Sequence, residues 1–282
     1  MKIYAPSYYK DFKCINNKCT HNCCIGWEID IDENSLDFYK TKEDIIRHID
    51  LTDTPHFVID NRERCPFLNN NNLCEIIINY GENRLCQICR DHPRFRNFYN
   101  TRTEIGLGLT CEVSTKLILE NDFYLTEIAE DCDIYLPDKE EEEFFKEREK
   151  ILDTPINKLK EFLPDFSIGF VANLFKELER LDSNWDKYLD ICITSKEKLK
   201  DIKINDKKLF YRLFSYFVYR HLYNYGLSFC LLCAFFVLVF QDDIYSAARI
   251  FSSEIEYSDE NIEKIRRTVE DAGPYIPLLP VH

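Results

Sequence analysis

Glycine is scarce in this chain: only seven of the 282 residues are glycine, so long loops and tight hairpins must be few. The one G-x-G, Gly106-Leu107-Gly108, lacks the third glycine of a dinucleotide-binding turn, and no strand–helix alternation surrounds it. A conventional α/β nucleotide site is therefore excluded. Serine and aspartate triads, phosphate-binding loops and H-E-x-x-H zinc helices are also absent.

Positive charge is in short supply as well. The 36 lysines and arginines face 50 acidic residues, which gives a net charge of −14. This balance repels nucleic acid and anionic membrane surfaces unless a strong local patch reverses it. We therefore expect no nucleic-acid partner.

A secretory leader is missing from the opening MKIYAPSYYK, which has no apolar stretch and no small-residue cleavage site. We therefore expect a cytoplasmic protein, whose cysteines the reducing compartment keeps as thiols. With 13 cysteines in the chain, metal ligation is then a better explanation than a disulfide scaffold.

The longest apolar run, residues 226–240, has 15 residues, whereas a membrane span needs about 20. Arg212, Arg220 and His221 lie just upstream and would be costly in lipid. We therefore predict a buried core helix and no membrane span. Cys230 and Cys233 in this run, and Cys192, are expected to be small core residues, because free cysteine packs like a hydrophobe.

The fold class predicted from these patterns is mainly α, with a cysteine-rich, metal-binding N-terminal half and a helical C-terminal half. A composition shift near Pro137, followed by the acidic segment 138–150, places the domain boundary between residues 1–136 and 137–282. Apolar residues recur at helical spacing in 155–182, 186–199 and 207–225. The short strands expected in the first half are Phe57–Asp60 and Glu104–Leu109. One face of 207–225 carries five residues: Phe210, Leu213, Phe214, Phe217 and His221.

Nine of the cysteines lie within the first 111 residues, in three linked patterns and one closing position. Spacings of two to four residues let two thiolates point at one ion from a single turn, as in zinc and iron–sulfur sites. The nine predicted metal ligands are Cys14, Cys19, Cys23 and Cys24, then Cys65 and Cys74, then Cys86 and Cys89, and finally Cys111.

The spacings favour an iron–sulfur cluster, of the 4Fe-4S type, over zinc. Zinc typically takes two regular pairs, whereas this stretch has one C-x-x-C and an irregular group at residues 14–24. A structural zinc site remains the alternative. His21 and His92 lie among the cysteines and could either bind the metal or hydrogen-bond to its ligands.

Arginine replaces lysine throughout residues 62–102, where there are seven arginines and no lysine. The planar guanidinium suits recognition of carboxylate or phosphate, and nearby arginines could offset the negative charge of a thiolate-bound cluster. The other reading is that they pair with local acids such as Glu63, Glu82 and Asp91.

Four motifs resemble those of the flagellin lysine-N-methylase family. They are FKCINNKCTHNCCIGW at 12–27, CPFL and LCEI within 65–76, LCQICRDHPRF at 85–95 and LTCE around Cys111. The cysteine cluster is shared more loosely with proteins described as zinc- or iron-chelating. Two later stretches, 214–223 and 254–265, are similar to helical segments of the methylase family.

The resemblance implies a bacterial cytoplasmic enzyme that transfers a methyl group to lysine side chains of flagellin or a similar surface protein. It also implies dependence on an iron–sulfur cluster and on S-adenosylmethionine. Arg90, Arg94 and Arg96 are then candidates to assist in binding the amino-carboxylate of this cofactor through charge-assisted hydrogen bonds. No catalytic base can be chosen, because seventeen tyrosines and many acids would serve.

The chain is short for the methylase family. It also lacks the C-x3-C-x2-C triplet that is common in a different group, the radical enzymes that cleave S-adenosylmethionine. Two further hypotheses therefore stay open: a non-enzymatic metal-binding module, and an electron-transfer or redox-sensing protein.

Overall fold

The computed structural model describes residues 2–130 and 138–272. The chain divides into two compact units. The first, called here the cysteine unit, comprises residues 13–94 and 111–113. The remaining described residues form the helical unit. The domain boundary expected at 136/137 lies outside the described residues.

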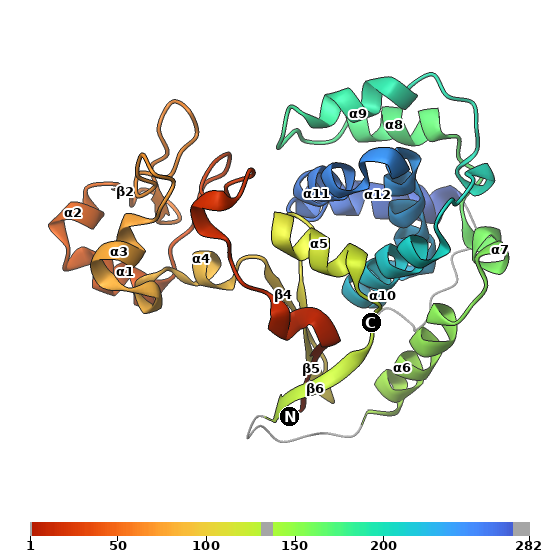
Figure 1. Ribbon diagram of the computed structural model, residues 1–282, viewed down its shortest axis with the longest axis horizontal. Helices are drawn as coiled ribbons and strands as arrows, with labels where there is room; N and C mark the ends of the chain where they lie inside the picture. The colour runs from red at the N-terminus through yellow and green to blue at the C-terminus, as the bar shows by residue number, and fades with distance from the viewer. Residues whose placement is uncertain (1, 131–137, 273–282) are drawn as a thin grey trace. The chain divides into compact units, whose positions relative to one another are not determined.

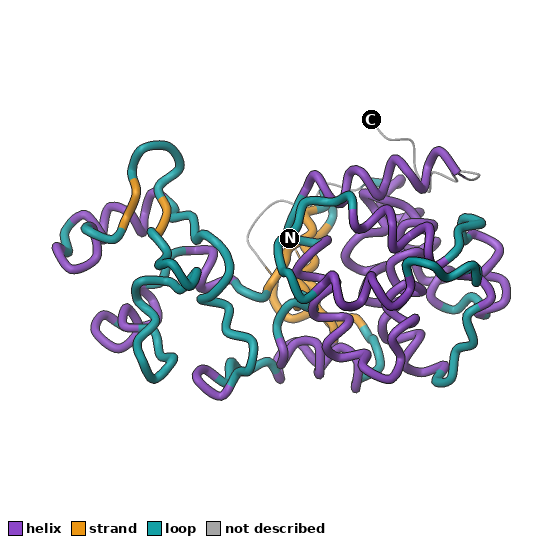
Figure 2. The backbone as a smooth tube through the Cα atoms, turned by 90° about the horizontal axis from the view of Figure 1, so that it is seen from above, coloured by secondary structure: helices purple, strands orange, loops and turns teal. Residues whose placement is uncertain are grey.

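The cysteine unit consists mainly of loops and short helices, drawn in teal and purple in Figure 2. Its small core is separate from that of the helical unit and includes Tyr39, Phe57 and Phe67. Its elements are η2 (Asn16–Lys18), α1 (Glu33–Lys40), α2 (Glu43–Ile46), β2 (Ile49–Asp50), β3 (His56–Phe57), α3 (Glu75–Tyr80), η3 (Glu82–Arg84) and α4 (Gln87–Asp91).

The helical unit contains a four-stranded sheet in the order β4-β5-β1-β6. The strands are β1 (Lys2–Pro6), β4 (Arg94–Phe98), β5 (Arg102–Leu107) and β6 (Leu125–Glu130). β1 pairs in parallel with β5 and antiparallel with β6, so its pairings join segments that are far apart in the sequence. Of the two expected strands, Glu104–Leu109 overlaps β5, and Phe57–Asp60 shares one residue with β3.

Helices make up the rest of this unit, and α10, α11 and α12 lie together at its centre (Figure 1). The acidic segment at 138–150 is a helix, because the Asp138 carboxylate caps α6 by accepting from the backbone N–H groups of Glu140 and Glu141. The elements are η1 (Ser7–Asp11), α5 (Glu112–Glu120), α6 (Lys139–Leu152), α7 (Ile156–Leu159), η4 (Lys160–Phe162), α8 (Ile168–Lys176), α9 (Trp185–Cys192), η5 (Leu199–Asp201), α10 (Lys207–Val237), η6 (Leu238–Asp243), α11 (Ile244–Ile255) and α12 (Asp259–Ala272).

Helix α10 bends at Gly226, where φ is 75° and ψ is 174°. Only glycine adopts this backbone region at low cost, so Gly226 allows the two apolar segments on either side to take different directions. By length and composition the continuous helical segment Lys207–Ile255, which comprises α10, η6 and α11, could cross a membrane, but 61% of its most apolar 18-residue stretch is buried. The core-helix prediction is confirmed by burial: Cys230 and Cys233 are 0% and 1% exposed, and Cys192 is 4% exposed.

A buried polar network lies between α10 and the end of α11. The Glu256 carboxylate accepts hydrogen bonds from Tyr216 Oη (2.7 Å) and Ser252 Oγ, contacts His221 Nε2 (2.5 Å) and pairs with Arg220 (3.4 Å). The two later stretches that carry the family resemblance, 214–223 and 254–265, therefore meet in this network. A second buried ion pair joins Glu104 on β5 to Arg148 on α6 by two hydrogen bonds of 2.7 Å.

The predicted fold class is confirmed: the described chain is mainly α, with short strands in its N-terminal part and helices in its C-terminal part. The segment expected at 155–182 is broken into α7, η4 and α8, and the segment expected at 186–199 is helical as α9 only as far as Cys192. The break before α8 has a clear cause, because Pro164 interrupts the chain and the Ser167 side chain caps the new helix.

Candidate metal centre

Cys23, Cys24 and Cys65 lie on two backbone segments that are hydrogen-bonded to each other. The Cys65 N–H donates to the carbonyl of Cys24 (2.8 Å), and the Gly26 N–H donates to the carbonyl of Glu63 (2.9 Å). Gly26 has a φ of 94°, which a residue with a side chain rarely adopts. These bonds bring two cysteine patterns together although they are distant in the sequence.

Cys74 and Cys86 each lie directly before a short helix. Cys74 precedes α3, and Cys86 precedes α4, which carries Cys89 one turn later. The start of α4 is fixed by Asp32, whose Oδ2 accepts from the Gln87 N–H (2.7 Å). Because Asp32 also caps α1, one carboxylate positions two helices of the cysteine unit.

The six thiols of these segments influence one another electrostatically. A hydrogen bond between the thiols of Cys23 and Cys24 lowers the pKa of Cys23 and raises that of Cys24. The same holds for Cys86, whose pKa is lowered, and Cys89, whose pKa is raised. The two pairs also affect each other, because negative charge on Cys24, and likewise on Cys65, would raise the pKa of Cys89.

Apolar side chains enclose part of this group, which we call the six-thiol group. Cys86 is 0% exposed and Cys65 is 7% exposed, and both belong to the core of the cysteine unit. Burial raises the pKa of Cys65 to about 12. The core residues packed there include Ile29, Tyr39, Phe57, Phe67 and Leu68.

The chemistry of the six-thiol group fits a thiolate-bound metal or cluster, since six thiols from three chain segments, most of them at least partly buried, influence one another. Among the residues that the model describes, no three histidine, cysteine or acidic side chains already form a group that could hold an ion. Binding would therefore have to draw the thiols of the six-thiol group together. Backbone hydrogen bonds hold at least two of their segments in register.

His92 and Trp27 flank this group. Their ring centroids are 6.2 Å apart, and the indole N–H of Trp27 donates to the carbonyl of Cys23 (2.7 Å). Burial lowers the pKa of His92 to about 4, and the charge of Arg94 adds to this effect. The imidazole is therefore neutral at pH 7.

Cys19 and Cys111 form a separate pair with other partners. The Cys19 thiol contacts Glu112 Oε2 (3.5 Å) and donates to the carbonyl of His21 (3.0 Å), and the charge of Cys111 also acts on it. Burial is the main reason why the pKa of Cys19 is raised to about 11. Of the nine predicted ligands, the structure thus groups six, pairs two, and leaves Cys14 exposed near the start of η2.

The arginines of the stretch 62–102 lie in different surroundings. Arg102 pairs with buried Glu104 (2.5 Å), so its role is structural. Arg90 follows Cys89 on α4 and is exposed, and Arg94 Nη1 lies 3.5 Å from the Arg90 carbonyl. Arg96 is exposed on β4, in the helical unit.

Two acidic residues that anchor segments of the cysteine unit were not predicted from the sequence. Asp32 was missed although aspartate is a preferred residue directly before a helix, where its carboxylate accepts from the Ser35 N–H. Glu112 was missed although it directly follows Cys111. In both cases the partner lies in another segment, which the local pattern does not reveal.

The chain is similar to three curated bacterial proteins, over less than half of its length. It is 24% identical to the "Flagellar biosynthetic protein FliU" of Salmonella muenchen over 133 residues, which are 43% of this chain and 79% of that protein. It is also 24% identical to the "Lysine-N-methylase" of Salmonella choleraesuis and of Salmonella typhimurium over 135 residues. That match covers 33% of each methylase, so this chain spans a third of their length. No family model and no solved structure matches. The chain is therefore a distant relative of the lysine-N-methylases.

Proposed function

We propose that this chain is a cytoplasmic protein-lysine N-methyltransferase that acts on flagellin or a similar surface protein. In this proposal the six-thiol group holds an iron–sulfur cluster, and S-adenosylmethionine is the methyl donor. The observation that carries the proposal is the six-thiol group, in a chain whose distant relatives are named lysine-N-methylases.

The spacing of the donors favours a cluster over a single ion. Structural zinc sites typically take two regular pairs of ligands, whereas these six thiols include a single C-x-x-C, Cys86 and Cys89, and iron–sulfur clusters accept irregular spacing. When bound, an iron–sulfur cluster supplies iron to which an amino-carboxylate can bind, and S-adenosylmethionine supplies the methyl group.

Arg90 and Arg94 are the residues of the cysteine unit that would hold the donor's carboxylate. Arg90 lies on α4 directly after Cys89, and Arg94 lies three residues beyond the end of that helix, with its Nη1 3.5 Å from the Arg90 carbonyl. Guanidinium groups suit a carboxylate, because each offers a planar fork of N–H donors.

Exposed isoleucines next to the thiols would receive the aliphatic part of a lysine side chain. Ile25 follows Cys24, Ile88 lies between Cys86 and Cys89, and each is 37% exposed. The lysine ammonium must lose its proton before the nitrogen can accept a methyl group. Contact with this apolar surface favours that loss, because desolvation lowers the pKa of an amine.

The test is methyl transfer by the anaerobically purified chain. Iron and sulfide per chain are measured first, and the chain is then incubated with methyl-labelled S-adenosylmethionine and a flagellin from the same cell. We expect label on lysine residues, located by peptide mass spectrometry. Cys89→Ser should lose both iron and labelling, whereas Cys192→Ser, in the core of the helical unit, should keep both.

Two results would contradict the proposal in different ways. Stoichiometric zinc without iron would remove the cluster and favour a structural metal module. An intact cluster with no label on lysine would remove the methyltransferase and favour electron transfer or redox sensing.

A further inference from the structure

The Cys19–Cys111 pair has protein partners of its own within the cysteine unit. Neither Cys19 nor Cys111 is among the main causes that shift the pKa values of the six-thiol group. Those causes come mainly from burial and from the other members of the group. Cys19 instead lies against Glu112 and close to Cys111. The division of the cysteines therefore points to two places for a metal.

Backbone and side-chain contacts already hold the loop around Cys19 against the segment 111–113. Glu112 Oε2 accepts from the Thr20 N–H (2.9 Å) and the Thr20 hydroxyl (2.7 Å), in addition to the Cys19 thiol. Oε2 accepts all three of these bonds, and the charge of His21 also acts on Glu112. A carboxylate thus lies beside a thiol and near an imidazole.

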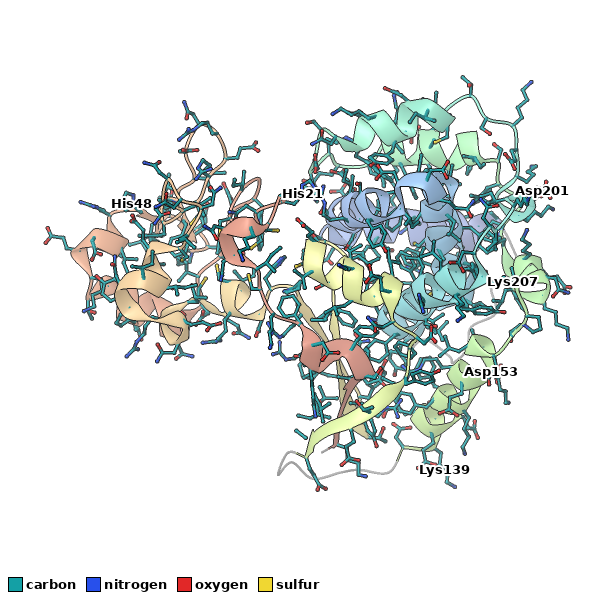
Figure 3. The ribbon with its side chains drawn as sticks, viewed as in Figure 1. His21, His48, Lys139, Asp153, Asp201 and Lys207 are labelled. Atoms are coloured by element: carbon teal, nitrogen blue, oxygen red, sulfur yellow. The ribbon has the colours of Figure 1, made fainter. Side chains whose placement is uncertain are left out.

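Two further donors lie on the same two segments. His21 is two residues from Cys19 on the loop after η2 and is labelled in Figure 3; the loop is exposed there. Cys111 directly precedes Glu112. The bonds between Thr20 and Glu112 therefore keep one imidazole, one carboxylate and two thiols on neighbouring pieces of backbone.

We propose that Cys19, His21, Cys111 and Glu112 bind one divalent metal ion, separate from the six-thiol group. Two sulfurs, one nitrogen and one oxygen suit zinc, a borderline-soft ion that takes all three atom types and prefers four ligands. The four described side chains do not yet surround one point, so binding would draw them together. The ion would join two segments that lie far apart in the sequence, and cross-linking a long loop is where such a link stabilises most. This second centre does not depend on methyl transfer.

Cobalt is the probe, because tetrahedral Co²⁺ bound to thiolates absorbs in the visible and near-ultraviolet while Zn²⁺ is silent. The full chain is titrated anaerobically with Co²⁺, and iron and zinc per chain are measured in parallel. We expect wild type to bind about one more ion than Cys19→Ser or Glu112→Gln, as one closed site would require. Both variants should keep their iron.

Glu112→Gln separates metal binding from folding. Its amide oxygen can still accept from Thr20, so the loop stays anchored while the anionic ligand is lost. The matched control is Glu120→Gln at the exposed end of the same helix, α5, which should bind Co²⁺ like wild type. Cys24→Ser should lose iron and keep the cobalt bands.

The ligand set would be overturned if Cys19→Ser or Glu112→Gln bound Co²⁺ as wild type does. Loss of iron together with the cobalt bands in Cys19→Ser would also overturn it, because one shared centre would then explain both. Failure of methyl transfer with the cobalt bands intact would contradict the proposed activity and leave the second centre standing.

Discussion

Replacing Glu256 by glutamine is expected to lower the free energy of unfolding of the helical unit by about 3 kcal/mol at pH 7. Burial alone would raise the pKa of Glu256, but the charge of Arg220 and the hydrogen bond from His221 outweigh it and hold the pKa at about 2. The ordinary value is 4.5. A difference of about 2.5 pKa units at 1.36 kcal/mol each gives the magnitude.

The sign of the pH dependence follows from this lowered pKa. Above about pH 4.5 the carboxylate is ionised in both the folded and the unfolded chain, so its full contribution is present. As the pH falls from about 4.5 towards 2, the unfolded chain takes up the proton first, and the contribution of Glu256 is lost. Wild type and Glu256→Gln should therefore converge in stability over that range.

The assay is urea unfolding followed by the fluorescence of Trp185, which is buried in the core of the helical unit. A Trp27→Phe background removes the only other tryptophan. The matched control is Glu263→Gln on α12. The Glu263 pKa is also about 2, chiefly because Arg266 and Arg267 bind it, but it is solvent-exposed, so its loss should change the stability little. Equal stability of wild type and Glu256→Gln at pH 7 would refute the reasoning.

Three other substitutions test separate parts of the structure. Arg148→Met should cost about 3–5 kcal/mol, because it leaves buried Glu104 without its bidentate partner; a loss below about 1 kcal/mol would contradict a buried pair. Gly226→Ala should cost about 1–3 kcal/mol from backbone strain alone, since a Cβ there meets nothing within 4 Å; unchanged thermal unfolding would count against the bend. Cys230→Ala should lower the free energy of unfolding by about 1–2 kcal/mol and leave the metal content unchanged. Loss of the bound metal in this variant would disprove the role of Cys230 as a core residue.

Local patterns in the sequence predicted the helical unit well. Apolar residues at helical spacing placed Phe210, Phe214 and His221 on one face of a helix, and all three are buried on α10. The same reasoning placed Cys230 in the core. These predictions succeed because residues three or four positions apart lie on the same face of a helix, so the buried face can be predicted from local spacing.

The sheet could not be predicted in this way. β1 pairs with β5 and β6, and nothing in the opening residues indicates partners that follow a hundred residues later. The Glu256 network has the same origin, since its members come from two separate helices. Which distant segments pair is decided only when the whole chain folds, and the local spacing of apolar residues does not indicate the partner.

For the metal site, the sequence by itself determined that thiols would gather in the first 111 residues. Only the tertiary structure decided how they divide. Cys19 and Cys23 are four residues apart, yet they fall into different groups, whereas Cys24, Cys65 and Cys89 come together across distant segments. The physical reason is that spacing limits which thiols can meet within a turn, while backbone pairing and the anchoring carboxylates of Asp32 and Glu112 select which turns meet.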